Sequence, residues 1–267
     1  MNLKERNELA VQLGNIASEA GKVIMTIRAC EISVNLKSDG SPVTQADIKA
    51  EHLIRARLAE IMPNLTIIAE ESFEAGCSDP APESFLLVDP LDGTREFLSG
   101  QTDFTVNIAL IGAGQPIVGA ICAPALNQVY LGGATAFRAD LQPGGVLPAL
   151  QALTVMEASP VPGSDMRAVA SRSHLDPTTE RFLGELPITE RRSAGSSLKF
   201  CLIARGEADV YPRLAPTMEW DTAAGHAILN AAGGSVRGLD GSPLRYGKAD
   251  VGFKNDGFIA WGRNPPV

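Results

Sequence analysis

Apolar residues recur along the first part of the chain with the spacing of amphipathic helices. From Leu9 to Ile27 they follow one another at alternating steps of four and three, which predicts a long helix with one buried stripe. A polar loop, 37–47, leads into a second predicted helix that Pro63 ends. The apolar face of this second helix consists of Ala50, Ile54, Leu58 and Ile61. Two helices on one side of a core are therefore expected.

Shorter apolar runs follow these helices and predict strands. Residues 65–69 form a run that ends in Glu70, and residues 85–89 form another that ends in the carboxylate of Asp89. Two further runs are joined by the turn 112–115 and predict a β-hairpin, because glycine-rich turns between apolar segments favour that connection.

The second half of the chain alternates strand-like and helix-like segments. A Pro/Gly-rich stretch, 142–164, has no sustained period and is expected to be a surface connection. We place a boundary before it, between an N-terminal half, 1–133, and a C-terminal half, 134–267. The alternation in the second half favours mixed α/β layers.

Composition and charge narrow the class of protein. The 267 residues carry a formal net charge of -8, which argues against a nucleic-acid polymer as partner, since such a surface is basic. Four scattered cysteines without C-x-x-C spacing favour reduced thiols over a zinc site. No apolar run could span a bilayer, and the charged N-terminus does not resemble a signal peptide. We expect a cytoplasmic protein without a membrane anchor.

The stretch "FLLVDPLDGTREFLSG" contains the strongest candidate chemistry. Asp89 closes an apolar strand and Asp92 follows three residues later, so two like charges lie close together. Such a pair is costly unless a cation or a proton lies between the groups. A simple turn, an acid pair and a metal site all remain open from this segment alone.

Two more acidic residues have similar positions in the chain. Glu70 ends a predicted strand and Asp221 opens a predicted helix, although a solvated strand end and a helix N-cap would also explain them. Ligands that are all oxygen suit Mg²⁺ or Mn²⁺ better than zinc. Gly93 and Thr94 precede a short helical segment whose free N–H groups could hold a phosphate. The combination suggests phosphoryl transfer to water.

Other catalytic patterns are absent from the sequence. It contains no G-x-S-x-G, H-E-x-x-H or G-x-x-x-x-G-K-[ST] motif. His52 and His226 fall inside predicted helices and are expected to be structural. His174 follows basic residues in a predicted loop and is a candidate ligand contact.

Three motifs in the same order resemble those of a known family. "AEES", "DPLDGT" and "WDTAAG" resemble the lithium-sensitive, Mg²⁺-dependent phosphomonoesterases of the inositol monophosphatase superfamily, and the resemblance covers nearly the whole chain. Within it, "DPLDGTREF", "FTVNIALI", "GSSLKFC" and "EWDTAAG" are most similar to the CysQ-type 3′(2′),5′-bisphosphate nucleotidases. The resemblance implies an α+β or α/β sandwich with alternating αβαβα layers and mixed sheets.

The resemblance also implies a metal site. Two or three Mg²⁺ ions are expected, with Mn²⁺ as a substitute, and paired ions about 3.5–4 Å apart would activate a water molecule for in-line attack. The metal ligands that it implies are the carboxylates of Glu70, Asp89, Asp92 and Asp221 and the backbone carbonyl of Leu91.

Two further roles follow from the resemblance. Gly93 and Thr94 would hold the scissile phosphate. Asp47 matches the family aspartate that pairs with the threonine matched by Thr94, and this pair, with Glu70, would orient and deprotonate the attacking water. An acidic residue in the first turn of a helix is also expected for its interaction with the helix dipole alone.

The implied substrate is adenosine 3′,5′-bisphosphate, a by-product of sulfate activation, with the related 5′-phosphosulfate as a second candidate. The implied products are AMP and phosphate. An inositol or sugar phosphatase on the same fold is the alternative within enzymes. A non-catalytic phosphate-binding regulatory module is the alternative of another class. The expected assembly is a monomer or a homodimer.

Basic residues of the second half would decide the substrate. Arg213 offers a guanidinium where inositol monophosphatases carry an acidic residue, which suits a second phosphate. Lys199 could reach the same phosphate, as could Arg172 or Arg192, although each could also be a surface cation. The predicted substrate contacts are Gly93, Thr94, His174, Ser196, Lys199, Arg213 and Asp221.

Overall fold

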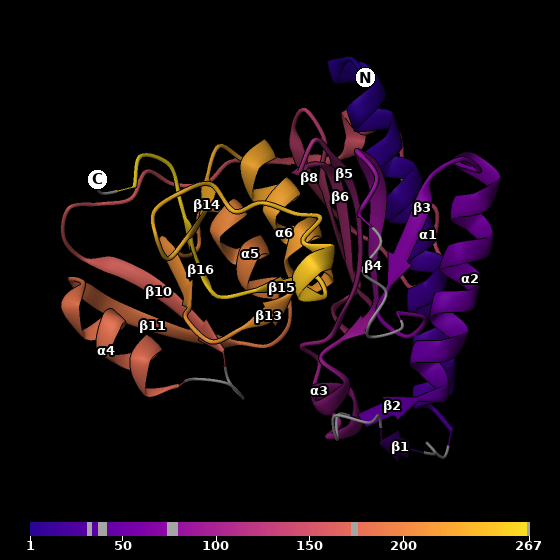
Figure 1. Ribbon diagram of the computed structural model, residues 1–267, viewed down its shortest axis with the longest axis horizontal. Helices are drawn as coiled ribbons and strands as arrows, with labels where there is room; N and C mark the ends of the chain where they lie inside the picture. The colour runs from indigo at the N-terminus through magenta and orange to yellow at the C-terminus, as the bar shows by residue number, and fades with distance from the viewer. Residues whose placement is uncertain (31–33, 37–41, 74–79, 172–175, 266–267) are drawn as a thin grey trace.

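The computed structural model describes residues 1–30, 34–36, 42–73, 80–171 and 176–265, and it arranges them in five layers (Figure 1). The first layer contains two helices, α1 (Leu3–Arg28) and α2 (Gln45–Ile61), which pack on one face of a large sheet. Both predicted helices are confirmed. Their buried stripes differ slightly from the prediction, because Ile24 is fully buried in α1 and Ile61 is exposed at the end of α2.

The second layer is a sheet of seven strands in the order β3-β4-β5-β6-β7-β8-β9. Its strands are β3 (Thr66–Ala69), β4 (Ser84–Asp92), β5 (Thr105–Gly112), β6 (Gln115–Ala123), β7 (Gln128–Gly132), β8 (Ala136–Asp140) and β9 (Thr154–Met156). Strands β3 and β4 are parallel and the other neighbours are antiparallel. The predicted hairpin is the pair β5–β6.

Strand β4 is apolar almost throughout because both faces of this sheet are covered. Successive side chains of a strand point to opposite faces. Phe85 and Leu87 therefore lie in the core on the α5/α6 side, whereas Leu86 and Val88 lie in the core under α1 and α2. A strand buried on both faces loses the apolar–polar alternation of a half-exposed strand.

The remaining layers belong to the second half of the chain. Helices α5 (Leu198–Ala204) and α6 (Glu219–Ala231) lie between the two sheets, and α4 (Pro177–Glu185) lies beyond the second one (Figure 1). That sheet has the order β11-β10-β12-β16-β14. Its strands are β10 (Met166–Ser171), β11 (Ile188–Ala194), β12 (Val210–Arg213), β14 (Ser235–Gly238) and β16 (Phe258–Trp261). The predicted αβαβα sandwich with mixed sheets is confirmed.

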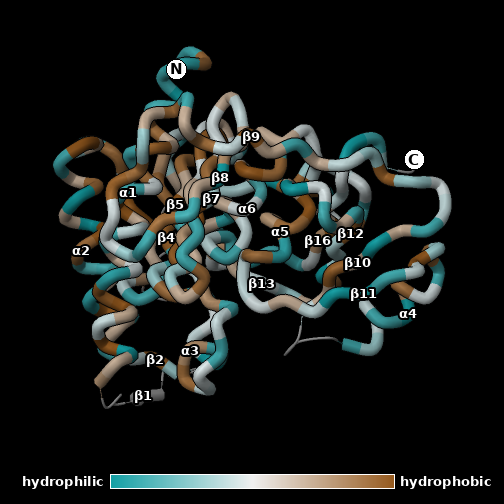
Figure 2. The backbone as a smooth tube through the Cα atoms, turned by 180° about the vertical axis from the view of Figure 1, so that it is seen from behind, coloured by the Kyte–Doolittle hydropathy of each residue, from teal (hydrophilic) through white to brown (hydrophobic). Residues whose placement is uncertain are grey.

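Short elements complete the described fold. They are β1 (Val34–Leu36), β2 (Pro42–Thr44), α3 (Thr94–Leu98), β13 (Thr217–Met218), β15 (Lys254–Asn255) and three 3₁₀ turns, η1 (Pro124–Leu126), η2 (Leu150–Ala152) and η3 (Ala249–Val251). Figure 2 shows the molecule from behind, with hydrophobic residues along β4, β5 and α5 and hydrophilic residues along β11.

The large sheet continues past the boundary that we placed at residue 134. Strands β8 and β9 follow that position in the chain and extend the seven-stranded sheet. The change from one sheet to the other falls between β9 and β10, after Met156. Among the described residues, no helix is both long enough and apolar enough to cross a membrane.

Helix α6 packs closely on the large sheet because small residues face it. A Cβ atom added at Gly132 in β7 would lie 2.5 Å from the Cα atom of Ile228 and 2.6 Å from its nitrogen. The helix backbone therefore occupies the space that a side chain would need. This contact sets the distance between the large sheet and the helix that carries Asp221.

We predict that Gly132→Ala destabilises the protein by about 1–3 kcal/mol, because overpacking must move the backbone of α6. The matched control is Gly184→Ala in α4, where an added Cβ meets nothing within 4 Å. This second change should stabilise the protein by about 0.5–1 kcal/mol through helix propensity. Urea unfolding of both variants measures the two effects, and equal effects would contradict the close packing.

Candidate active site

A cavity of about 310 Å³ opens between the two halves of the molecule. The first half contributes the ends of β3 and β4 and the start of α3, and the second half contributes residues from α5, β12 and the first turn of α6. The predicted site residues that line it are Glu70, Asp89, Leu91, Asp92, Gly93, Thr94, Ser196, Lys199, Arg213 and Asp221.

Three carboxylates meet in this cavity from three different elements. Glu70 follows β3, Asp89 lies in β4 and Asp221 lies in the first turn of α6. One oxygen atom of each lies within 4.8 Å of the others, and Asp89 is only 1% exposed. Residues far apart in the chain thus converge, as the motifs suggested.

A bulge in β4 directs the neighbouring carboxylate, Asp92, toward the second half. Asp89 pairs with Asn107 and Asp92 pairs with Thr105, so β4 has one residue more than β5 over this stretch. An extra residue bends a strand and changes the direction of its side chains. The bulge separates the two carboxylates of the "DPLDGT" turn and places the Leu91 carbonyl between them in the chain.

Asp92 is held by residues of the "GSS" segment. Its Oδ2 accepts hydrogen bonds from the Ser196 hydroxyl at 2.6 Å and from the Ser197 backbone N–H at 2.7 Å. The Ser197 hydroxyl lies 3.0 Å from the same oxygen and 2.7 Å from the Asp221 carbonyl, and it can donate to either. The Asn107 amide lies 3.4 Å from Asp92 Oδ2 and donates to the Ser197 hydroxyl at 2.9 Å. These bonds fix the orientation of the Asp92 carboxylate across the junction of the two halves.

Asp47 has two roles that use different oxygen atoms. Its Oδ2 accepts from the backbone N–H and the hydroxyl of Thr44, which caps α2. Its Oδ1 lies 3.2 Å from the Thr94 hydroxyl, which can also donate to the Leu91 carbonyl at 3.1 Å. Asp47 therefore lies in the first turn of α2, as its interaction with the helix dipole would require, and also contacts Thr94, as the resemblance implies.

The turn after Asp92 requires glycine. Gly93 has φ +91°, a left-handed conformation in which a side chain would be strained, and an added Cβ would lie 3.0 Å from the Asp103 carbonyl oxygen. Helix α3, with only five residues, begins at the next position, Thr94. Gly93 and Thr94 thus place backbone atoms directly on the cavity wall.

The carboxylates perturb one another. Burial raises the pKa of Asp89 well above its ordinary value, and the charges of Glu70, Asp92 and Asp221 raise it further. Burial also raises the pKa of Asp221, with Asp92 and Glu70 adding to the effect. The pKa of Asp47 is raised by burial, although its bonds from Thr44 and Thr94 oppose this.

This set of donors suits a divalent metal ion. The clustered atoms are carboxylate oxygens, the preferred ligands of hard cations, and a cation among them would remove the repulsion that raises their pKa values. The acid-pair interpretation alone does not account for Glu70, Asp89 and Asp221 meeting at one point.

Two basic side chains line the same cavity. Lys199 is buried, its ammonium donates to the carbonyl of Ser196 and lies 5.1 Å from the ring centre of Tyr211, and burial lowers its pKa to about 8. Arg213 ends β12 and lowers the pKa of Asp221, which shows that its charge acts on the cluster.

The remaining candidates divide into residues that the structure does not describe and residues away from the cavity. His174 and Arg172 fall outside the described residues. Arg192 is not among the residues that line the cavity, because it lies on exposed β11 and forms ion pairs with Glu190 at 2.7 Å and Glu207 at 3.5 Å. His226 is buried against the Tyr246 hydroxyl, at 3.0 Å, as a structural histidine would be.

The polar residues that hold the ligands were not predicted from the sequence. Thr105 and Asn107 lie opposite Asp92 and Asp89 in the sheet, and the Thr105 hydroxyl lies 2.9 Å from the Asn107 side-chain oxygen. Their signal was available: both interrupt the apolar strand "FTVNIALI" two residues apart, on one face. Ser197, whose backbone N–H donates to Asp92, was not among the predicted site residues.

Comparison with known proteins agrees with this geometry. A model of the inositol monophosphatase family matches residues 5–263, so the chain belongs to that family. The 3′(2′),5′-bisphosphate nucleotidase CysQ of Escherichia coli K12 is 41% identical over 249 residues, which cover 92% of this chain and 97% of the relative.

Solved structures show the same relationship. The crystal structure of CysQ from Bacteroides thetaiotaomicron, described as a bacterial member of the inositol monophosphatase family, is 36% identical with a TM-score of 0.83 and covers 97% of this chain and 98% of its own. The extragenic suppressor protein suhB of Bartonella henselae is 27% identical with a TM-score of 0.70, covering 94% and 92%. The resemblance stated from the motifs is confirmed.

We predict that divalent cations stabilise the protein more strongly as the pH rises. Without a cation, carboxylates with raised pKa values favour the protonated folded state, so stability is lost as the pH increases through those values. A cation binds the ionised forms and removes this penalty. At 100 times its dissociation constant Mg²⁺ should add about 2.7 kcal/mol, and the gain should shrink as the pH falls from neutral toward the ordinary carboxylate range.

Thermal unfolding with and without Mg²⁺, at constant ionic strength, measures this effect. Asp89→Asn is the informative variant, since it removes one buried charge from the cluster. The metal-free variant should be more stable than the wild type at neutral pH and should gain little from Mg²⁺. A gain from Mg²⁺ that is the same in both proteins would contradict the assignment.

Proposed function

We propose that the protein is a 3′(2′),5′-bisphosphate nucleotidase that removes the 3′-phosphate of adenosine 3′,5′-bisphosphate and releases AMP and phosphate. The observation that carries this proposal is a single cavity lined both by an acidic cluster and by two cations, Lys199 and Arg213. A substrate with two phosphate groups fits such a lining, since one phosphate would meet the cluster and the other the cations. Relatives named as this enzyme support it.

Mg²⁺ is the cofactor that we propose, as two or three ions, with Mn²⁺ as a substitute. Glu70, Asp89, Asp92, Asp221 and the Leu91 carbonyl would hold it, because these oxygens line the cavity. When bound, the metal would supply an acidified water nucleophile and would neutralise charge on the phosphoryl group.

The side chains of Thr94 and Asp47 would accept the proton that the attacking water loses. The Thr94 hydroxyl can accept a hydrogen bond from the attacking water while it donates to Asp47 Oδ1 at 3.2 Å. Burial raises the pKa of Asp47, which makes its carboxylate a better proton acceptor at neutral pH. Glu70, which lines the same cavity, would orient the water.

The scissile and second phosphates would be held by different residues. Gly93 and Thr94 would contact the scissile phosphate at the start of α3. Arg213 and Lys199 would contact the second phosphate, because a guanidinium and a buried ammonium both suit a dianion in a partly enclosed cavity. Ser196 and Asp221 are the remaining proposed substrate contacts. A 5′-phosphosulfate could occupy the same place.

Two alternatives are less well supported. An inositol monophosphatase would use the same acidic cluster but would not need the two cations, because its substrate has no second phosphate. A fructose 1,6-bisphosphatase would have a use for them, and relatives named as nucleotidases favour the nucleotide instead. A regulatory phosphate-binding module would have no need for a buried, mutually repelling set of carboxylates. We place the enzyme in the cytoplasm, in accord with the free thiols of Cys30, Cys122 and Cys201, as a monomer or homodimer.

The test is phosphate release in Mg²⁺ from adenosine 3′,5′-bisphosphate, inositol 1-phosphate and fructose 1,6-bisphosphate under identical conditions. We predict the highest kcat/KM for the nucleotide bisphosphate. A preference for inositol 1-phosphate would overturn the substrate assignment. Absence of turnover with all three would favour a binding module.

The role of Arg213 can be examined in the same assay with Arg213→Met. Loss of one charge-assisted contact costs about 1.5–3 kcal/mol, so kcat/KM for adenosine 3′,5′-bisphosphate should fall by about 10- to 100-fold. Adenosine 3′-monophosphate lacks the second phosphate and serves as the control substrate. A similar loss for both substrates would show that Arg213 does not contact the second phosphate.

A further inference from the structure

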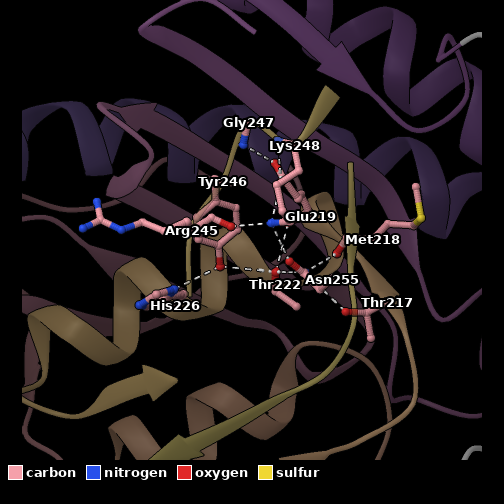
Figure 3. Close-up of polar contacts among 10 residues, drawn as sticks. All are labelled: Thr217, Met218, Glu219, Thr222, His226, Arg245, Tyr246, Gly247, Lys248 and Asn255. Carbon is pink, nitrogen blue, oxygen red and sulfur yellow. Dashed lines mark hydrogen bonds and ion pairs between the residues drawn. The ribbon is translucent and has the colours of Figure 1, made fainter. Parts of the chain in front are cut away.

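The position of Asp221 depends on the first turn of α6. This residue is the third of the helix, and its Oδ2 accepts from the backbone N–H of Met218 at 2.9 Å. Its carboxylate is therefore fixed to the turn, and any shift of the turn moves it relative to Glu70 and Asp89. What holds the turn is a group of polar residues behind the cavity, shown in Figure 3.

Glu219 is the centre of that group. It is the first residue of α6 and its side chain is 0% exposed. One carboxylate oxygen accepts from the backbone N–H of Gly247 at 2.7 Å, and the other accepts from the backbone N–H of Lys248 at 3.0 Å and from its ammonium at 2.7 Å (Figure 3). The backbone N–H of Glu219 donates to the Phe253 carbonyl at 2.8 Å.

Lys248 extends the connection to a second buried side chain. Its ammonium donates to the Asn255 side-chain oxygen at 3.0 Å, and to the carbonyl of Arg245. The Asn255 amide donates to the Thr222 hydroxyl at 3.1 Å and approaches the Met218 carbonyl at 3.3 Å (Figure 3). Hydrogen bonds thus hold the turn at Glu219 and also at Met218 and Thr222, the residues on either side of it.

The group reaches the cavity but is not part of its wall. Thr217 and Thr222, which Asn255 contacts, line the cavity, whereas Glu219, Lys248 and Asn255 are not among the lining residues. A buried carboxylate that lost its partners would be strongly destabilised, so the ion pair ties the segment 245–255 to the helix in one arrangement.

We propose that Glu219 and Lys248 form a positioning pair for Asp221 and thereby set the affinity of the carboxylate cluster for its cation. The inference rests on the cation site of the proposed function. Residues that orient a metal ligand from behind influence affinity by about 10- to 100-fold when they are removed. Neither side chain touches the substrate in this assignment.

Two single substitutions distinguish positioning from a simple effect of charge. Glu219→Gln removes a negative charge near the cluster, and Lys248→Met removes a positive one. A long-range field alone predicts that the first weakens cation binding and the second strengthens it. Positioning predicts that both weaken it, because either change releases the turn. Lys248→Arg, which keeps the charge, should recover most of the affinity.

The measurement is Mn²⁺ binding without substrate, followed by the EPR signal of free Mn²⁺. We expect the dissociation constant to rise by about 10-fold in Glu219→Gln and in Lys248→Met. Saturating Mg²⁺ should then restore most of kcat. Glu219→Gln removes the buried charge itself and leaves Lys248, which is 31% exposed, so this variant is expected to fold even where Lys248→Met, which leaves a buried carboxylate without its cation, is impaired.

A matched ion pair elsewhere controls for lost stability. Asp209 is 1% exposed and pairs at 2.7 Å with Arg167, which is 30% exposed, and neither residue lines the cavity. Asp209→Asn should lower the stability to urea by an amount similar to that in Glu219→Gln and should change Mn²⁺ affinity by less than about 2-fold, since it leaves the turn of α6 in place.

Each outcome is decisive. Unchanged Mn²⁺ affinity in the folded Glu219 and Lys248 variants, or tighter binding in Lys248→Met, overturns the positioning role while the cation site stands. A loss of affinity of the same size in Asp209→Asn also overturns it. Wild-type protein that binds no Mn²⁺ overturns the cation site and the inference together.

Discussion

Mutual repulsion among clustered carboxylates is the constraint that organises this molecule. Glu70, Asp89 and Asp221 bring oxygen atoms within 4.8 Å of one another, and Asp89 is almost completely buried. Such an arrangement is unfavourable for the protein alone, because like charges in a poorly solvated place raise one another's pKa. It becomes favourable when a divalent cation is present. The fold therefore loses stability at a site whose ligands suit a divalent cation.

The surrounding structure keeps the carboxylates in place against this repulsion. Asp89 Oδ1 accepts from the Leu91 N–H at 3.0 Å, Asp221 from the Met218 N–H, and Asp92 from the "GSS" segment. In each case a hydrogen bond to one oxygen orients the group within its own turn or across the two halves. Because Asp92 and Asp221 depend on the second half, the site exists only when the two sheets and the helices between them are assembled.

Local sequence patterns were sufficient to predict many of the helices and strands and the acidic residues of the site. The helices α1 and α2, the strand β4 and the hairpin β5–β6 follow from periodicity, since each is long and regular. The acidic residues at strand ends and the "DPLDGT" turn were visible as an unusual local concentration of charge. These features depend on residues close in the chain, where spacing predicts geometry.

Contacts between segments far apart in the chain could not be predicted from local sequence patterns. Strands β8 and β9 join the large sheet although their segments are short and irregular, and Ser197 reaches Asp92 from the other half of the chain. The network around Glu219 joins residues of α6 to the segment 245–255 and has no local signature. The glutamate that precedes "WDTAAG" is visible in the sequence, but nothing near it identifies Lys248 as its partner.

The central claim is that the acidic cluster exists to bind a divalent cation for phosphate release. The most direct test is the rate of phosphate release from adenosine 3′,5′-bisphosphate by protein stripped of metal with a chelator, before and after Mg²⁺ is added back. We expect negligible release from the stripped protein and recovery of the full rate with Mg²⁺. Release at an undiminished rate without any divalent metal would contradict the account.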